Sequence, residues 1–79
     1  MCGIAGFLDQ RNYFQPEKSH NIVKNMGNII SFRGPDSFGT WSDSTKKIFF
    51  AHQRLAILDL SIAGHQPMTS FSSRYSITF

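Results

Sequence analysis

The only cysteine of this 79-residue chain stands at position 2, directly behind the initiator methionine. Removal of Met1 would place the α-amine of the chain beside the Cys2 thiol. In model peptides an α-amine titrates near ~7.7–8.0 and a thiol near ~8.5, so near neutral pH part of the amine is free to accept the thiol proton. One residue would then supply both a nucleophile and its base.

Other roles for Cys2 are open at this level. Free cysteines are commonly buried, so Cys2 is also compatible with a small apolar residue at a sheet edge. A lipid-modified cysteine would need an upstream signal sequence, which is absent. His20, His52 and His65 are too scattered to nominate a Cys–His pair, and with one cysteine they form no zinc spacing. We therefore predict no metal in this segment.

Composition limits the function classes. The chain is 41% hydrophobic and 16% charged, with eight Phe, which is typical of a packed globular protein. Its net charge of +3 is spread along the chain, and the longest basic run is Lys46-Lys47, so we expect no nucleic-acid partner. A single cysteine cannot form an internal disulfide, and no apolar run is long enough for a membrane helix. We expect a cytoplasmic protein with no membrane partner.

The elements that must position Cys2 read as strand, helix and then several strands, which predicts an α+β fold. Residues 2–8 form a short apolar run with two glycines, which predicts a buried strand. Pro16 and Glu17 suit the first turn of a helix over residues 16–31. The predicted apolar face of this helix contains Ile22, Val23, Met26, Ile29 and Ile30.

Turn and strand signals alternate over the rest of the chain. "RGPDSFG", residues 33–39, predicts a loop, and "SDST", residues 42–45, predicts a hairpin tip. Strands are predicted over residues 47–53, 55–60 and 74–79, with a loop over 63–68. One helix cannot cover both faces of such a sheet, and the last strand reaches the last residue. We expect a truncated domain.

Four segments, "MCGIAGFLD", "RGPDSFG", "AHQRLAILDLS" and "GHQPM", occur in this order. Together they resemble the amino-terminal domain of glutamine-dependent asparagine synthetases, which are class II glutamine amidotransferases. "RGPD" resembles this branch more than the glucosamine-phosphate, phosphoribosyl-amine or glutamate synthase branches. The resemblance implies the amino-terminal nucleophile hydrolase fold, a four-layer αββα sandwich. Residues 1–79 would be the amino-terminal part of the glutaminase domain, with one main helix and several antiparallel strands.

The resemblance also implies roles for individual residues. Cys2 matches the nucleophile that attacks the side-chain amide of glutamine, and Arg54 matches the arginine that binds the α-carboxylate of the substrate. The alternative for Arg54 is an exposed surface arginine. The backbone of Ile57 and Leu58 matches a segment that approaches the bound glutamine.

The "RGPD" segment has two interpretations. By resemblance it is a loop beside the pocket, and otherwise it is a turn in which Arg33 and Asp36 bond the backbone. We favour an organising role over catalysis. The chain departs from the family at Gln53 and Ala56, where Arg or Glu and Ser are common. The family's oxyanion-hole residues would follow Phe79, so this segment alone is expected to be inactive.

Several functions remain open. The first is the glutaminase half of an asparagine synthetase, which passes ammonia to a carboxy-terminal synthetase domain for amidation of aspartate. That domain would need ATP and Mg, whereas no cofactor is expected in this segment, and the parent could be a homodimer. Alternatives are a degenerate interaction domain, an amidotransferase for another carboxylate, and a small basic binding module. The last lacks the clustered Lys and Arg with aromatics that it would need.

Overall fold

The computed structural model describes residues 2–56 and 60–79. Their elements, in chain order, are strand β1 (Gly3–Leu8), helix α1 (Pro16–Ile29), the 3-10 turn η1 (Ser31–Arg33), strands β2 (Ser37–Ser42) and β3 (Ile48–Arg54), the 3-10 turn η2 (Ile62–Gly64), and strands β4 (Met68–Thr69) and β5 (Ser76–Ile77). One main helix and antiparallel strands confirm the predicted α+β class.

A three-stranded antiparallel sheet with the order β1-β3-β2 is the centre of the fold. Gly3 pairs with Gln53 and Leu8 with Ile48, while Ser37 pairs with Arg54 across the other side of β3. Successive side chains of a strand point to opposite faces. The side chains of the central strand β3 therefore alternate between the two faces of the sheet, while its backbone pairs with β1 on one side and with β2 on the other.

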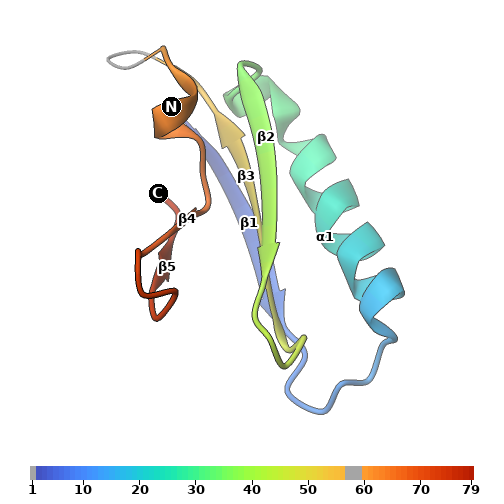
Figure 1. The fold of residues 1–79 in the computed structure, drawn as a ribbon. Coiled ribbons are helices and arrows are strands. Elements are labelled where there is room, and N and C mark those ends of the chain that lie inside the picture. The colour runs from blue at the N-terminus through green and yellow to red at the C-terminus, as the bar shows by residue number, and fades with distance from the viewer. Residues whose placement is uncertain (1, 57–59) are drawn as a thin grey trace.

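One face of the sheet packs against α1 (Figure 1). Val23 of the helix and Phe49 and Ala51 of β3 form the buried core, and the rings of Phe7 and Phe49 stack with centroids 5.1 Å apart. The amide of Gln53 donates a buried hydrogen bond of 2.9 Å to the Gly27 carbonyl. This hydrogen bond joins the helix to β3 one residue before the end of the strand.

The helix begins at Pro16 as predicted, but it ends at Ile29 and not at residue 31. The predicted apolar face is wrong at Ile29, whose side chain is 76% exposed. The buried positions are Ser19, Val23 and Gly27, each four residues apart. A Cβ on Gly27 would lie 2.5 Å from Phe38 Cε1, so the helix approaches the sheet closely at Gly27, and the hydrophobic pattern marks neither Gly27 nor Ser19 as buried.

The predicted loop over residues 33–39 is wrong from Ser37 onward, because β2 begins there. Gly39 lies inside the strand for a reason unrelated to turns. A Cβ at this position would collide with the Gln66 carbonyl and lie 2.8 Å from His65 Nε2. The glycine allows the segment around residues 65–66 to lie directly on the sheet, on the face away from α1.

That second face carries the small antiparallel sheet β4-β5, on the side opposite α1 (Figure 1). The predicted last strand is reduced to Ser76–Ile77, and β4 lies at the end of the predicted 63–68 loop. Gln66 Oε1 accepts a hydrogen bond of 2.7 Å from the Phe79 amide, and His52 Nε2 lies 2.9 Å from the Phe79 carbonyl oxygen. The His52 contact attaches the hairpin to β3, whereas the Gln66 bond holds Phe79 to the segment that precedes β4.

The predicted strand over residues 55–60 is wrong at Leu55 and Ala56, because β3 ends at Arg54; residues 57–59 lie outside the described part. The second face is only partly covered, since Ile4 and Leu8 are 50% and 61% exposed. In the described ranges, no helix has the length and apolar character needed to cross a membrane.

Candidate functional site

Cys2 directly precedes β1 and is half-buried. Continuing the β1–β3 register by one residue from the Gly3–Gln53 pair sets Cys2 opposite Arg54. The Leu55 amide donates a hydrogen bond of 3.4 Å to Cys2 Sγ, and the Leu55 carbonyl oxygen lies 3.9 Å from the same sulfur. The sulfur therefore lies against the backbone that leaves β3.

Arg54 is the last residue of β3, and its side chain is only 8% exposed. The interpretation as a surface arginine is therefore wrong. Its Nη1 donates a hydrogen bond of 2.6 Å to the Ser61 carbonyl. A Cβ on Gly64 would lie 2.7 Å from the guanidinium carbon, so the backbone of η2 packs against the guanidinium group. These contacts orient a buried cation beside the register position of Cys2.

The residues in and before η2 that contact Arg54 were not predicted from the sequence. Ser61 and Gly64 contact Arg54 through backbone atoms and through the lack of a side chain, respectively. Ser61 also accepts a hydrogen bond of 3.2 Å from the Ala63 amide through its Oγ, which caps η2. The only sequence signal for this role was the glycine in "GHQPM", and it did not specify Arg54 as the contact.

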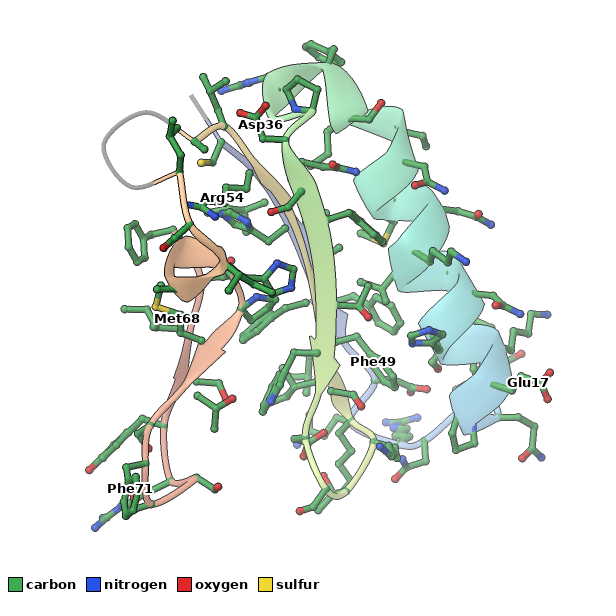
Figure 2. The ribbon with its side chains drawn as sticks, turned by 45° about the horizontal axis from the view of Figure 1, so that its top comes forward. Glu17, Asp36, Phe49, Arg54, Met68 and Phe71 are labelled. Atoms are coloured by element: carbon green, nitrogen blue, oxygen red, sulfur yellow. The ribbon has the colours of Figure 1, made fainter. Side chains whose placement is uncertain are left out.

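The "RGPD" loop lies against the same end of β3. The Asp36 amide donates to the Arg54 carbonyl oxygen at 2.9 Å, and Asp36 Oδ2 accepts from the Ala56 amide at 2.7 Å. A Cβ on Gly34 would collide with the Gln53 carbonyl oxygen and lie 2.6 Å from the Arg54 carbonyl carbon. Asp36 therefore bonds backbone as the turn interpretation expected. Figure 2 shows Asp36 and Arg54 at the same end of the sheet.

The remaining predicted residues lie elsewhere. Ile57 and Leu58 lie outside the described residues, so their predicted approach to glutamine stays a prediction. The side chain of Gln53 faces α1, on the opposite face from Arg54, and bonds the helix backbone. His52 is fully buried and contacts Phe79, which fits a structural role.

The described residues bring no three His, Cys, Asp or Glu side chains close enough together to hold a metal ion. This end of the sheet carries the Cys2 thiol and the buried guanidinium of Arg54. A thiolate can attack an electrophilic carbon, and a guanidinium can bind a carboxylate with two parallel hydrogen bonds. A substrate with a carboxylate and an acyl carbon suits this pair.

Comparisons with known proteins indicate the family of the chain. Asparagine synthetase [glutamine-hydrolyzing] 2 of Bacillus subtilis is 43% identical over 67 residues, covering 85% of this chain. Asparagine synthetase [glutamine-hydrolyzing] 1 of the same organism is 33% identical over the whole chain. A putative asparagine synthetase [glutamine-hydrolyzing] 2 of Methanocaldococcus jannaschii is 43% identical over 70 residues, or 86% of the chain. No significant match was found among solved structures.

The chain spans 9% to 13% of the length of these three relatives. The relatives therefore share with it only a small part of their own sequences. The family model for the glutamine amidotransferase domain matches residues 1–79, which is the whole chain. The chain therefore belongs to the glutamine amidotransferase domain family and is similar to the corresponding part of the asparagine synthetases.

Proposed function

We propose that this chain is the amino-terminal part of a glutaminase domain that hydrolyses glutamine and supplies ammonia for the synthesis of asparagine. The observation that carries the proposal is the position of Cys2. Its sulfur accepts a hydrogen bond from the Leu55 amide, and continuing the β1–β3 register by one residue puts Cys2 opposite the buried Arg54. The similarity to glutamine-hydrolyzing asparagine synthetases supports the choice of substrate. The fold we propose for the complete domain is the αββα sandwich of amino-terminal nucleophile hydrolases.

The proposed reaction begins when the α-amine of Cys2, free after removal of Met1, accepts the thiol proton. The sulfur then attacks the side-chain amide carbon of glutamine. The carbon–nitrogen bond breaks, and the leaving nitrogen takes the proton and departs as ammonia. A γ-glutamyl thioester remains on Cys2. Water hydrolyses this thioester, which releases glutamate and restores the thiol.

Arg54 would bind the α-carboxylate of glutamine in this scheme. Its burial supports the role, because a charge pair shielded from water is stronger than an exposed one. The contacts from Ser61 and Gly64 hold the guanidinium in one orientation, which reduces the entropy lost on binding. The backbone of Ile57 and Leu58 is proposed to approach the same substrate.

The rest of the proposal concerns the whole protein. A carboxy-terminal synthetase domain, with ATP and Mg, would use the ammonia to amidate aspartate, and residues 1–79 alone would be inactive. We place the protein in the cytoplasm and allow for a homodimer. An acceptor carboxylate other than aspartate, or a domain that no longer turns over, is the alternative. The presence of Cys2 and Arg54 favours turnover, because a degenerate domain would more readily have another residue in place of Cys2.

The test is Cys2→Ala in the full-length protein. The variant should lose asparagine synthesis from glutamine and keep synthesis from supplied ammonium, because the synthetase site needs ammonia and not its source. Asparagine is quantified with each nitrogen source, and intact mass of the wild type reports whether Met1 is absent from active molecules. Glutamine-driven synthesis that survived Cys2→Ala would contradict the nucleophile assignment. Full activity of molecules that all retain Met1 would contradict the role of the amine.

A further inference from the structure

At the end of β3, the backbone groups of three consecutive residues form hydrogen bonds outside the strand ladder. The Arg54 carbonyl oxygen accepts from the Asp36 amide, the Leu55 amide donates to Cys2 Sγ, and the Ala56 amide donates to Asp36 Oδ2. Asp36 thus bonds the residue on each side of Leu55. The Leu55 amide that faces the sulfur lies at the centre of this arrangement.

We propose that Asp36 is a positioning residue for the Cys2–Arg54 site, acting through the backbone of residues 54–56. The inference rests on the proposed glutaminase function. Asp36 contacts neither the sulfur nor the guanidinium in the hydrogen bonds described above. Through these two bonds Asp36 orients the Leu55 amide toward Cys2 Sγ. The same bonds fix the backbone from which the Arg54 side chain extends.

Two physical features make this contact stiff. The bond from the Ala56 amide to a carboxylate is charge-assisted, which makes it about twice as strong as a neutral one. Gly34 allows the loop to touch the end of β3 directly, because any side chain there would collide with the Gln53 carbonyl oxygen. A displacement of about 1 Å at a reacting group can cost about 10²-fold in rate, so a small shift of Leu55 is measurable.

A matched control exists at the other end of the β2–β3 pair. Asp43 Oδ1 accepts hydrogen bonds from the Lys47 and Ile48 amides at 2.8 and 2.9 Å. Asp43 follows Ser42, which pairs with Phe49, whereas Asp36 precedes Ser37, which pairs with Arg54. Both aspartates therefore bond the backbone of β3 or its immediate flank, and only Asp36 does so beside Cys2.

The experiment compares Asp36→Ala, Asp36→Asn, Asp43→Ala and Cys2→Ala in the full-length protein. Three quantities are measured: glutaminase kcat and KM, the rate of Cys2 alkylation by iodoacetamide as a function of pH, and ammonium-dependent synthesis as the folding control. Peptide mass spectrometry assigns the alkylation to Cys2. Alkylation depends on the thiolate and its surroundings and needs no turnover of glutamine.

Asp36→Ala should lower kcat/KM for glutamine about 10- to 100-fold and slow Cys2 alkylation about threefold or more near neutral pH, because the Leu55 amide no longer holds the sulfur in position. Asp36→Asn should fall between wild type and Asp36→Ala, because its amide oxygen still accepts the Ala56 amide without a charge. Asp43→Ala should stay within about twofold of wild type in both measurements.

Equal behaviour of Asp36→Ala and Asp43→Ala in kinetics and alkylation would overturn the proposal. If Asp36→Ala loses the ammonium-dependent activity through misfolding, Asp36→Asn decides, and wild-type values in both measurements would overturn it. Failure of the proposed function has a different signature: the wild type would show no glutaminase activity, or Cys2→Ala would keep it. The alkylation comparison would still report whether Asp36 acts on Cys2.

Discussion

At the scale of single residues, Arg54 offers the most direct measurement of how the proposed substrate is held. Its side chain is 8% exposed and its guanidinium contacts Ser61 and Gly64. Removing one side of a desolvated charge pair costs ~2–5 kcal/mol, whereas an exposed pair is worth only ~0–1 kcal/mol. We expect Arg54→Ala in the full-length protein to raise the KM for glutamine by about 30-fold or more.

Two variants sharpen this prediction. Arg54→Lys keeps the charge but loses the planar fork, so it should recover only part of the binding. Gly64→Ala keeps the arginine and pushes its guanidinium, since a Cβ at this position would lie 2.7 Å from the guanidinium carbon. Its KM should lie between wild type and Arg54→Ala. Ammonium-dependent synthesis reports folding, and a KM of Arg54→Ala within about twofold of wild type would exclude Arg54 from the substrate site.

At the scale of elements, the β2–β3 hairpin depends on Asp43. The pKa of its carboxyl is lowered from 3.8 to about 2, first by the hydrogen bond from the Ile48 amide and then by that from the Thr45 hydroxyl. A carboxylate with a lowered pKa in the folded state stabilises that state above the unfolded pKa. This stabilisation is complete above about pH 4 and is lost as the pH falls through about 2.

We therefore expect Asp43→Asn to reduce the hydrogen-exchange protection of the Lys47 and Ile48 amides near neutral pH. The difference from wild type should shrink between about pH 4 and pH 2, where the wild-type carboxyl itself becomes protonated. Protection factors, which correct for the intrinsic exchange rate, make the comparison at each pH. A difference that stayed constant down to pH 2 would mean that the charge of Asp43 does not stabilise the turn.

The contact between α1 and the sheet depends on Gly27. A Cβ there would lie 2.5 Å from Phe38 Cε1 and 3.0 Å from Ala51 Cβ, so in Gly27→Ala either the Phe38 ring or the helix must shift. Overpacking of this kind typically costs ~1–3 kcal/mol, which exceeds the ~1 kcal/mol by which alanine favours a helix over glycine. We expect a lower Tm for the full-length Gly27→Ala variant. The exposed neighbour Asn28 is the control, and Asn28→Ala should leave the Tm unchanged or higher.

At the scale of the whole molecule, the small β4-β5 sheet is joined to the main sheet through Phe79. Gln66 Oε1 accepts a hydrogen bond from the Phe79 amide, and His52 Nε2 lies within hydrogen-bond distance of the Phe79 carbonyl oxygen. Gln66 and His52 are both buried, at 6% and 0% exposed. His52 joins Phe79 to the main sheet, and Gln66 holds Phe79 to the segment that precedes β4, so the two side chains together fix the position of this residue.

Gln66→Ala should therefore release the Phe79 amide and increase hydrogen exchange in the peptide that contains it, while the core strand around Phe49 keeps its protection. Thr69→Ala is the control, because this exposed side chain bonds only Ser76 Oγ, at 3.3 Å, among the contacts described for it. Hydrogen exchange is followed by mass spectrometry on the full-length protein. Equal hydrogen exchange of the Phe79 peptide in both variants would show that the Gln66 side chain does not protect the Phe79 amide.

The sequence by itself determined the α+β class, the helix start at Pro16, the hairpin turn around residues 42–45 and the family to which the chain belongs. These depend on local chemistry: proline suits a first helical turn, and polar turn residues separate apolar strands. The candidates Cys2 and Arg54 were also visible, because a terminal thiol and a motif arginine are properties of the residues themselves.

Only the tertiary structure decided what surrounds those candidates. It set Cys2 opposite Arg54 through the strand register, and it ended β3 at Arg54, where side chains replace the strand ladder as partners of the next amides. It also assigned Gly27 and Gly39 to close approaches between elements, so that neither marks a turn. These features depend on contacts between residues distant in the chain, and local propensity carries no information about which distant group will meet a given backbone amide.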